Sequence, residues 1–184
     1  MLPELEYIRL LMIKKKNIII SFLAGIALIV LYVIIFSFSE QDSVQSGAIS
    51  IGVSRKCINF LNDLFGGEWS ELFMTDMAAF FEHPIRKLGH FTEYACMGIL
   101  LYIMLRPFIE KKKKLFIIIA VWVFLSAGAD EIHQLYVPGR YGCIQDVCLD
   151  TIGGTFGFFV CKMIENIHKK RKLKKEKKKN TADA

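Results

Sequence analysis

The sequence predicts an all-α integral membrane protein, a bundle of four transmembrane helices with an outer loop that contains one or two interfacial helices. Three observations lead to this prediction. The 184 residues are 53% hydrophobic and their mean hydropathy is +0.38, which is more apolar than an ordinary soluble domain. Four apolar runs reach the roughly 17–25 residues that cross a bilayer. Lysine and arginine, which give a net charge of +6, are gathered between these runs.

The four predicted spans cover residues 17–38, 88–105, 115–137 and 144–164. All four are expected to be helical, because lipid offers no hydrogen-bond partner to an open backbone. The first is nearly pure Ile, Leu, Val and Phe. Its apolar stretch is longer than the ~7–15-residue core of a signal peptide and no A-x-A site follows it, so we expect an uncleaved anchor. The other three spans carry acids or histidine near one end.

The basic clusters predict the orientation of the spans. They precede the first span at residues 14–16, join spans two and three at residues 111–114, and follow span four as HKKRKLKKEKKK. Because basic residues favour the cytoplasmic side, we expect both termini inside. The chain then divides into a cytoplasmic N-terminus (1–16), a membrane domain (17–164) and a basic cytoplasmic tail (165–184). The loop at 39–87, which carries four basic and seven acidic residues, lies outside.

The outer loop contains a helical pattern. Apolar residues recur at spacings of three and four before Gly66 and Gly67, which we expect to end a helix. A second apolar set runs from Trp69 to Phe81. Two interpretations stay open: helices lying on the outer interface with aromatic rings at headgroup level, or a lid over a site. The residues of the first stripe are Ile49, Val53, Cys57, Phe60, Leu61 and Leu64.

Ionisable residues on three spans are predicted to lie at one height. At 1.5 Å per residue, Asp130, Asp150 and His90 lie roughly 21–22 Å above the basic edge, in the outer third of a ~30 Å core. Within each helix the polar residues follow i, i+3, i+4 spacing and so share a face, and buried ionisable groups normally turn toward the bundle interior. We therefore expect one pocket that opens to the outside. Its members are His90, Glu93, Asp130, Glu131, His133, Gln134, Asp146 and Asp150, with Arg86, Lys87 and Arg140 at the rim.

Three stretches that contain these polar residues resemble the motifs of a known family. RKLGHFTEY (86–94), DEIHQLYVPGR (130–140) and DVCLDTIGG (146–154) resemble the signature blocks of the VanZ-like family, and SFSEQDS after the first span resembles its Ser/Gln-rich stretch. The family is named for an accessory protein associated with low-level teicoplanin resistance. The resemblance implies a bacterial cell membrane, a role in the cell envelope and a link to glycopeptide resistance, without implying a mechanism.

The pocket has several candidate functions. In the first, His90 or His133 is a general base, Glu93 or Asp130 orients it or acts as acid, and the basic rim holds a phosphate of a lipid-linked or cell-wall substrate. In the second, the pocket binds a headgroup, a lipid-linked cell-wall precursor or a glycopeptide without chemistry. In the third, the polar residues pair with one another and only fix the bundle. An ion-coupled transporter is less favoured, because four spans without a repeat leave little room for alternating access.

The cofactor and the remaining partners follow from composition. Two histidines and several carboxylates are suited to a zinc or manganese site, but no compact signature such as H-E-x-x-H is present, so a divalent metal is not favoured. The lysine-rich tail is expected to lie on anionic inner-leaflet lipid and not on nucleic acid, because it lacks interleaved aromatics. Gly153, Gly154 and Gly157 predict a close helix approach. A disulfide between Cys57 and Cys143 stays open.

Overall fold

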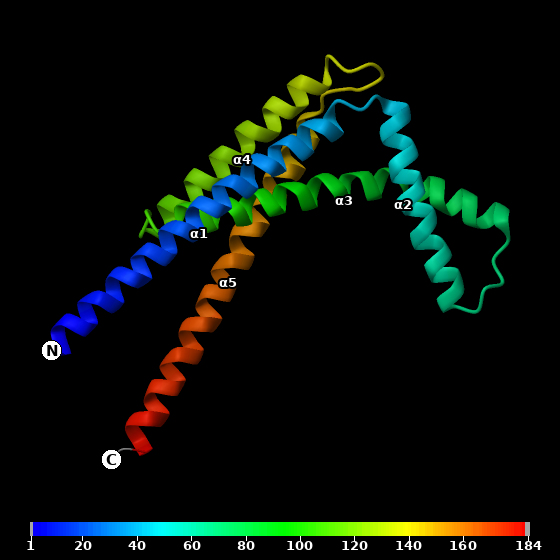
Figure 1. The fold of residues 1–184 in the computed structure, drawn as a ribbon. Helices are drawn as coiled ribbons and strands as arrows, with labels where there is room; N and C mark the ends of the chain where they lie inside the picture. The colour runs from blue at the N-terminus through cyan, green and yellow to red at the C-terminus, as the bar shows by residue number, and fades with distance from the viewer. Residues whose placement is uncertain (1, 183–184) are drawn as a thin grey trace.

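The computed structural model describes residues 2–182 as helices joined by short connections, with side chains described for Met12 and for residues 14–175 (Figure 1). Every regular element in this range is an α-helix, as predicted. The elements are α1 (Leu2–Ser39), α2 (Ser43–Leu64), α3 (Glu71–Leu105), α4 (Lys112–Gln134) and α5 (Ile144–Ala182).

Four of the five helices are long and apolar enough to cross a membrane, which confirms the prediction of four spans. The candidate spans are Lys14–Ser39, Glu71–Leu105, Lys112–Gln134 and Ile144–Lys175. The protein is therefore a multi-pass membrane protein, and the lipid bilayer is its surrounding medium. The side on which each end lies stays a prediction.

Helix boundaries differ from those of the predicted spans. α3 begins at Glu71 instead of near residue 88, and it runs through Pro84 without interruption. α5 continues through the basic tail to Ala182, and α4 ends at Gln134 instead of 137. The reason is that an apolar run marks depth in lipid, whereas a helix continues wherever its backbone hydrogen bonds are made, and Lys and Glu are good helix formers.

The bundle is closed by a glycine contact between α3 and α5. A Cβ atom on Gly98 would lie 2.0 Å from the carbonyl oxygen of Gly154, and one on Gly157 would lie 2.2 Å from the carbonyl oxygen of Ala95. Only glycine allows backbones to approach this closely. The predicted role of the α5 glycines is confirmed, and Gly98 is the α3 partner that the sequence analysis did not identify.

An apolar core fills the middle of the bundle and separates two polar ends. α1, α3, α4 and α5 all contribute to it, with Met97, Leu101, Ile119, Val123 and Phe158 almost fully buried. Such packing fixes the relative positions of the four helices. It therefore also fixes the polar groups that each helix carries at its two ends.

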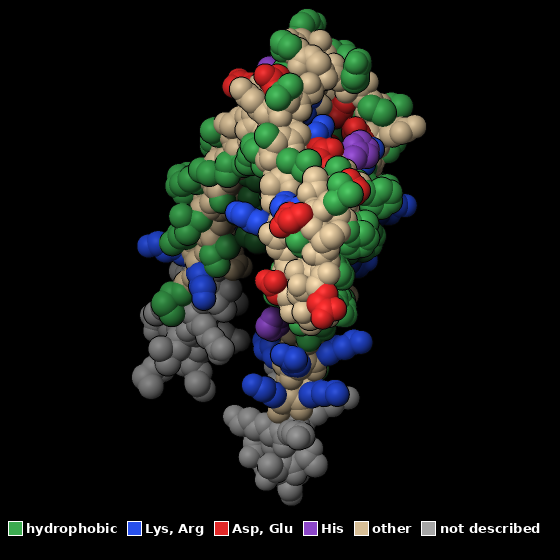
Figure 2. Space-filling view, turned by 90° about the vertical axis from the view of Figure 1, so that its right-hand side faces the viewer, with side chains coloured by type: hydrophobic (Ala, Val, Ile, Leu, Met, Phe, Trp, Pro, Cys, Tyr) green, Lys and Arg blue, Asp and Glu red, His purple; other side chains and the backbone are tan. Residues whose placement is uncertain are grey.

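One polar end is organised around Glu165 on α5. Its carboxylate accepts a hydrogen bond from the Tyr102 hydroxyl and forms ion pairs with Arg106 (3.2 Å), Lys112 (3.4 Å) and Lys169 (2.8 Å). The hydrogen bond to Glu165 raises the pKa of the Arg106 guanidinium. Lys and Arg side chains gather around the C-terminal part of α5 (Figure 2). We call this region the basic end.

The other end carries an arm, which we define as α2 together with residues 71–84 of α3 (Figure 1). α2 packs on α3 through every fourth residue, and small hydroxyl side chains make the contact. Ser54 Oγ donates to the Ala78 carbonyl oxygen at 2.7 Å, and Ser50 Oγ donates to Glu82. The buried seam consists of Ser46, Ser50, Ser54, Ile58 and Asn62.

The predicted apolar stripe of α2 faces away from α3. Val53 is 45% exposed, Phe60 67% and Leu64 64%. Gly66 and Gly67, which follow the helix end at Leu64, both have positive φ, so their predicted role in ending the helix is confirmed. The outward stripe is compatible with an interfacial helix, and that location stays a prediction.

Candidate functional site

A polar cavity of about 340 Å³ lies where α3, the end of α4 and the start of α5 meet. Eight of the eleven residues that the sequence assigned to a pocket line it: Arg86, Lys87, His90, Glu131, Gln134, Arg140, Asp146 and Asp150. They come from three helices and one loop, so the predicted convergence in space is observed. Their roles in function stay predictions. We call this space the polar cavity.

The loop between α4 and α5 closes one wall of the cavity. Gly139 has φ 73°, a left-handed conformation that suits glycine, and the Arg140 N–H donates to the Val137 carbonyl at 3.2 Å. A Cβ on Gly142 would lie 2.9 Å from the carbonyl oxygen of Glu131, so the loop lies directly against the end of α4. The turn thus returns the chain and directs Arg140 back toward α1.

Two of the cavity carboxylates have protein partners. Asp146 Oδ1 lies 2.7 Å from Lys87 Nζ, which joins α5 to α3. Glu131 Oε2 accepts a hydrogen bond from the Cys143 N–H at 2.7 Å, just before α5 begins at Ile144. A carboxylate is favourable there, because the first N–H groups of a helix are unpaired and carry partial positive charge.

Other buried groups around the cavity have no such partner. Among the described residues, nothing hydrogen-bonds to either carboxylate oxygen of Asp150, to Asp130 Oδ1 or to His90 Nδ1. Asp150 is fully buried and Asp130 is 2% exposed. Buried polar atoms are normally hydrogen-bonded, and each exception in a folded protein calls for an explanation. The unpartnered groups therefore distinguish this region from a purely structural polar network.

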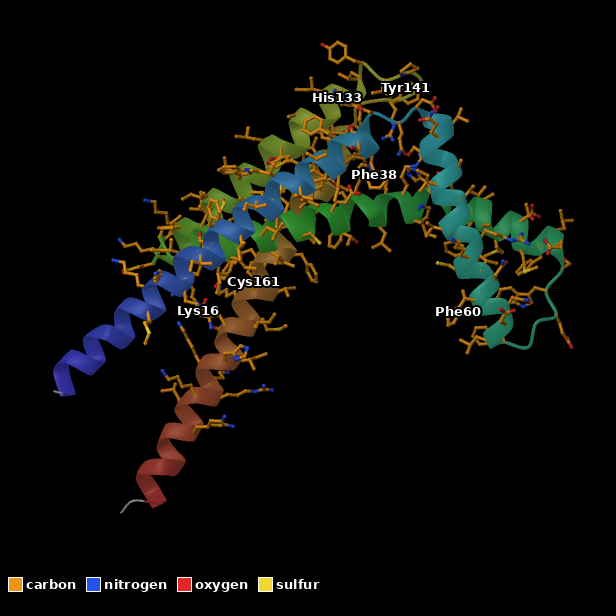
Figure 3. All side chains as sticks on the ribbon, in the orientation of Figure 1. Lys16, Phe38, Phe60, His133, Tyr141 and Cys161 are labelled. Atoms are coloured by element: carbon orange, nitrogen blue, oxygen red, sulfur yellow. The ribbon has the colours of Figure 1, made fainter. Side chains whose placement is uncertain are left out.

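Three predicted residues lie around the polar cavity without lining it. Asp130, whose second oxygen accepts from Gln134 Nε2 at 3.0 Å, is close enough to His90 and Asp150 to interact electrostatically. His133 packs edge-on against the Phe36 ring, with centroids 5.6 Å apart, at the same end of the bundle as Phe38 and Tyr141 (Figure 3). Glu93 lines a neighbouring space.

That neighbouring space is a groove of about 510 Å³ between α1, α2 and α3, which we call the lateral groove. Its walls are largely apolar, and Glu93 and Thr92 on α3 face it. Arg86, His90 and Arg140 line both the lateral groove and the polar cavity. The two spaces therefore meet at these three side chains.

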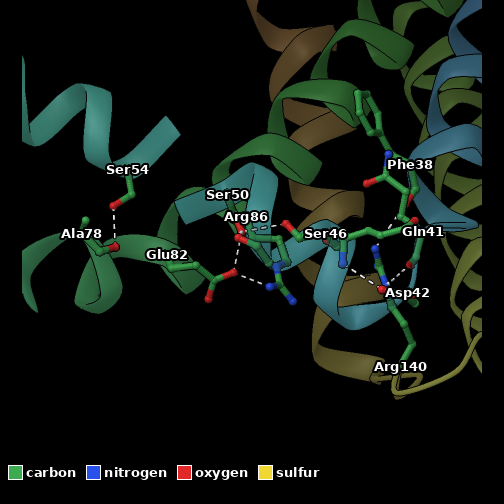
Figure 4. A network of polar contacts seen from close by, with 12 residues as sticks. Phe38, Gln41, Asp42, Ser46, Ser50, Ser54, Ala78, Glu82, Arg86 and Arg140 are labelled. Carbon is green, nitrogen blue, oxygen red and sulfur yellow. Dashed lines mark hydrogen bonds and ion pairs between the residues drawn. The ribbon is translucent and has the colours of Figure 1, made fainter. Parts of the chain in front are cut away.

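Both shared arginines already make protein contacts (Figure 4). Arg140 donates from Nε to the Gln41 carbonyl at 3.0 Å and from an Nη to the Phe38 carbonyl at 3.2 Å, which ties the α4–α5 loop to the end of α1. Burial lowers the pKa of the Arg140 guanidinium. Arg86 pairs with Glu82, yet its Nε is buried without a partner among the described residues. Arg86 thus retains an unused donor at the junction.

A metal site has little geometric support. Among the described side chains, no three His, Cys, Asp or Glu residues are grouped as a metal ion would require. Zinc and manganese sites use at least three protein ligands of these kinds in most proteins. A divalent ion therefore has no ready set of ligands in this part of the chain.

His83, which was not predicted from the sequence as a site residue, also lines the polar cavity. Its spacing is a usable signal, since residues 83, 87 and 90 follow i, i+4, i+7 and share one face of α3. His83 fell within the predicted outer loop, because the second span was expected to begin at residue 88. The continuous helix places His83 one turn before Lys87.

Fold and site together define a polytopic α-helical membrane protein with four spans and a polar cavity at one end of the bundle. The VanZ/LLP1 family model matches residues 24–165, and the chain belongs to this family. The resemblance seen in the sequence is thereby confirmed. No curated protein and no solved structure matches the chain.

Proposed function

We propose that this VanZ-like protein of the bacterial cell membrane uses the polar cavity, facing outward, to bind or act on a lipid-linked or cell-wall-related substrate, and so contributes to glycopeptide (teicoplanin) resistance. The family name supports the resistance link. The positive-inside rule supports the orientation, because Lys and Arg gather at the basic end and the cavity lies at the other.

The observation that carries this proposal is the set of unpartnered polar atoms around one cavity. Asp150 and Asp130 offer acceptor oxygens, while His90 Nδ1 and Arg86 Nε have no partner among the described residues. A buried carboxylate without a partner is expensive to maintain. A ligand with hydroxyl or amino donors would satisfy the carboxylates, and its phosphate or carboxylate would accept from the arginine.

Two modes of action fit the cavity. In a catalytic mode, His90 takes or gives a proton beside Asp130, as histidine does near neutral pH. In a binding mode, the ligand is only held. The binding mode is favoured by one observation: within the described part of the chain, no hydrogen bond joins His90 or His133 to a carboxylate, an arrangement that orients most histidine bases.

The test uses a glycopeptide-sensitive bacterium that expresses the protein. His90→Gln, Asp130→Asn, His133→Gln and Asp150→Asn are made singly, with Asp76→Asn, on an exposed position of the arm, as a control. Amounts in the membrane and teicoplanin susceptibility are measured for each. We expect the His90 and Asp150 variants to insert normally and lose resistance, while the control retains it. Normal resistance in all four cavity variants would refute the proposal.

Analysis of extracted cell-wall and lipid precursors separates the two modes. A structural change in a precursor that depends on His90 would establish chemistry. Unchanged precursors, with resistance still lost in the His90 variant, would establish binding alone. Loss of the protein from the membrane in every variant would instead favour a structural role for the polar residues.

A further inference from the structure

The lateral groove has the shape and chemistry of a site for a lipid chain. Its walls are largely apolar side chains from three helices, with Thr92 and Glu93 among them, and its volume of about 510 Å³ lies within the range of known ligand sites. α1 and α3 contribute to it from within candidate membrane spans. The apolar lining that the argument uses comprises Leu31, Phe38, Ile49, Val53, Leu88 and Cys96.

Exposed apolar side chains lie at the mouth of the groove. Leu88 on α3 is 61% exposed and Ile49 on α2 is 48% exposed, although both line the groove. Residues at a lipid-facing mouth are expected to be apolar in this way. A hydrocarbon chain can therefore enter from the bilayer without crossing a polar surface.

The lateral groove is lined by basic side chains where it meets the polar cavity. Arg86, Arg140 and His90 lie there, and they border both spaces. Arg86 Nε and His90 Nδ1 are buried and have no partner among the described residues. Guanidinium and imidazole N–H groups both bind phosphate, so this junction suits a phosphate group.

We propose that the protein binds an amphipathic lipid with a phosphate-bearing headgroup, with its chain in the lateral groove, its phosphate at Arg86 and His90, and its donor groups reaching Asp150 in the polar cavity. The chemistry of the two spaces carries this inference: largely apolar walls in the lateral groove, basic side chains at the shared junction, and buried carboxyl groups at the polar cavity. A molecule with a hydrocarbon chain, an anionic group and hydroxyl or amino donors in that order matches it. The inference rests on the proposed function, since it takes the polar cavity as a ligand site.

Native mass spectrometry of the full chain in detergent micelles tests the inference. The probes are long-chain phosphatidylglycerol, long-chain phosphatidylcholine, and dihexanoyl phosphatidylglycerol, whose chains are too short to fill the groove. We expect long-chain phosphatidylglycerol to bind at least about tenfold more tightly than either of the others, because it alone has both the anion with donors and the buried chain. Equal binding of the short-chain lipid would show that the protein recognises a soluble headgroup and would overturn the inference.

Matched variants locate the chain. Val53→Trp places an indole in the groove, and Val44→Trp makes the same change on the same helix at a residue that is 77% exposed and outside the groove lining. We expect Val53→Trp to weaken long-chain phosphatidylglycerol by about tenfold and to leave the short-chain lipid unchanged, while Val44→Trp alters neither. Equal effects of the two tryptophans would overturn the inference.

Variants at the junction locate the phosphate. Arg86→Gln is expected to weaken both phosphatidylglycerols. His90→Gln, which breaks no hydrogen bond made by a described residue, gives a second reading in case Arg86→Gln does not fold. Unchanged binding of both lipids in the folded variants would overturn the inference. If the lipids bind as expected and the cavity variants leave teicoplanin susceptibility unchanged, the inference stands and the proposed function fails. If the cavity variants lose resistance and the lipids do not bind as expected, the proposed function stands and the inference fails.

Discussion

α5 carries two carboxyl groups in opposite situations, one at each polar end of the bundle. Glu165, at the basic end, has a side chain that is 21% exposed and is held by Tyr102, Arg106, Lys112 and Lys169. Asp150, which borders the polar cavity, is completely buried and has no hydrogen-bond partner among the described residues. They are about 22 Å apart along one helix. The better-buried acid is the one without partners.

The difference indicates that Glu165 stabilises the fold, whereas Asp150 does not. A paired charge cluster can hold helices together, and removing one member leaves the others uncompensated. A buried carboxyl group without hydrogen-bond partners destabilises the folded state and persists only where something else requires it. The comparison therefore assigns a stabilising role to the basic end and supports the proposed ligand binding at the cavity end.

The largest expected effect comes from the glycine contact that joins both ends. Gly157→Val would place its Cβ only 2.2 Å from the Ala95 carbonyl oxygen, and overpacking of this severity is expected to lower the free energy of unfolding by about 3 kcal/mol. Gly128→Val on α4 is the control, since no neighbour lies within 4 Å of its Cβ. Thermal unfolding in detergent measures both. Similar melting temperatures for the two variants would contradict the close contact.

Glu165→Gln tests the basic end. Glutamine keeps the size of the side chain and removes the charge that Arg106, Lys112 and Lys169 share, so we expect a loss of about 2 kcal/mol. The loss should shrink in high salt, because the lysines are partly exposed to solvent. Wild-type stability in Glu165→Gln would show that this cluster does not hold the helices, and the comparison would fail.

Arg140→Lys tests which of the cavity cations is structural. Lysine retains the charge but cannot reproduce both hydrogen bonds to the Phe38 and Gln41 carbonyls. We expect a loss of about 1 kcal/mol and faster hydrogen exchange in the connection between α1 and α2. Unchanged exchange there would mean that Arg140 contributes only its charge.

Asp150→Asn is expected to have the smallest effect on stability and gives the sharpest comparison. Because it replaces a buried carboxyl group that has no hydrogen-bond partner by an amide of the same size, the free energy of unfolding should stay unchanged or rise by up to about 1 kcal/mol. Measured beside Glu165→Gln in the same detergent, it should therefore show none of the loss expected of that variant. A loss as large as that of Glu165→Gln would place Asp150 among the structural charges.

The spans and the convergence of polar residues could be predicted from the sequence for a simple reason. Apolar runs report length in lipid, and the constant rise of a helix converts positions such as His90, Asp130 and Asp150 into heights. The height of a residue does not give the direction in which its side chain points about the helix axis. For this reason the sequence could not predict that Glu93 lines the lateral groove, or that Asp130 lies outside the lining of the polar cavity.

The buried serines of α2 and the role of Glu165 could not be predicted from the sequence. Ser50 and Ser54 look solvent-facing by polarity, but they form the buried seam of the arm, because small hydroxyl groups allow close packing and can satisfy a facing carbonyl or carboxylate. Glu165 follows the predicted end of the fourth span and resembles one charge among many in a basic tail. Its importance depends on Tyr102 and Arg106, which are about sixty residues away in sequence.

Pro84 has a mechanical consequence for the arm. It offers no N–H to the carbonyl of Phe80, so α3 lacks one of its backbone hydrogen bonds there and resists bending less than elsewhere along its length. The Arg86–Glu82 ion pair spans this point, and Glu82 also holds Ser50 of α2. The Arg86–Glu82–Ser50 contacts therefore brace the arm at the one turn of α3 where its backbone is weakened, and one of these braces is a guanidinium that borders the cavity.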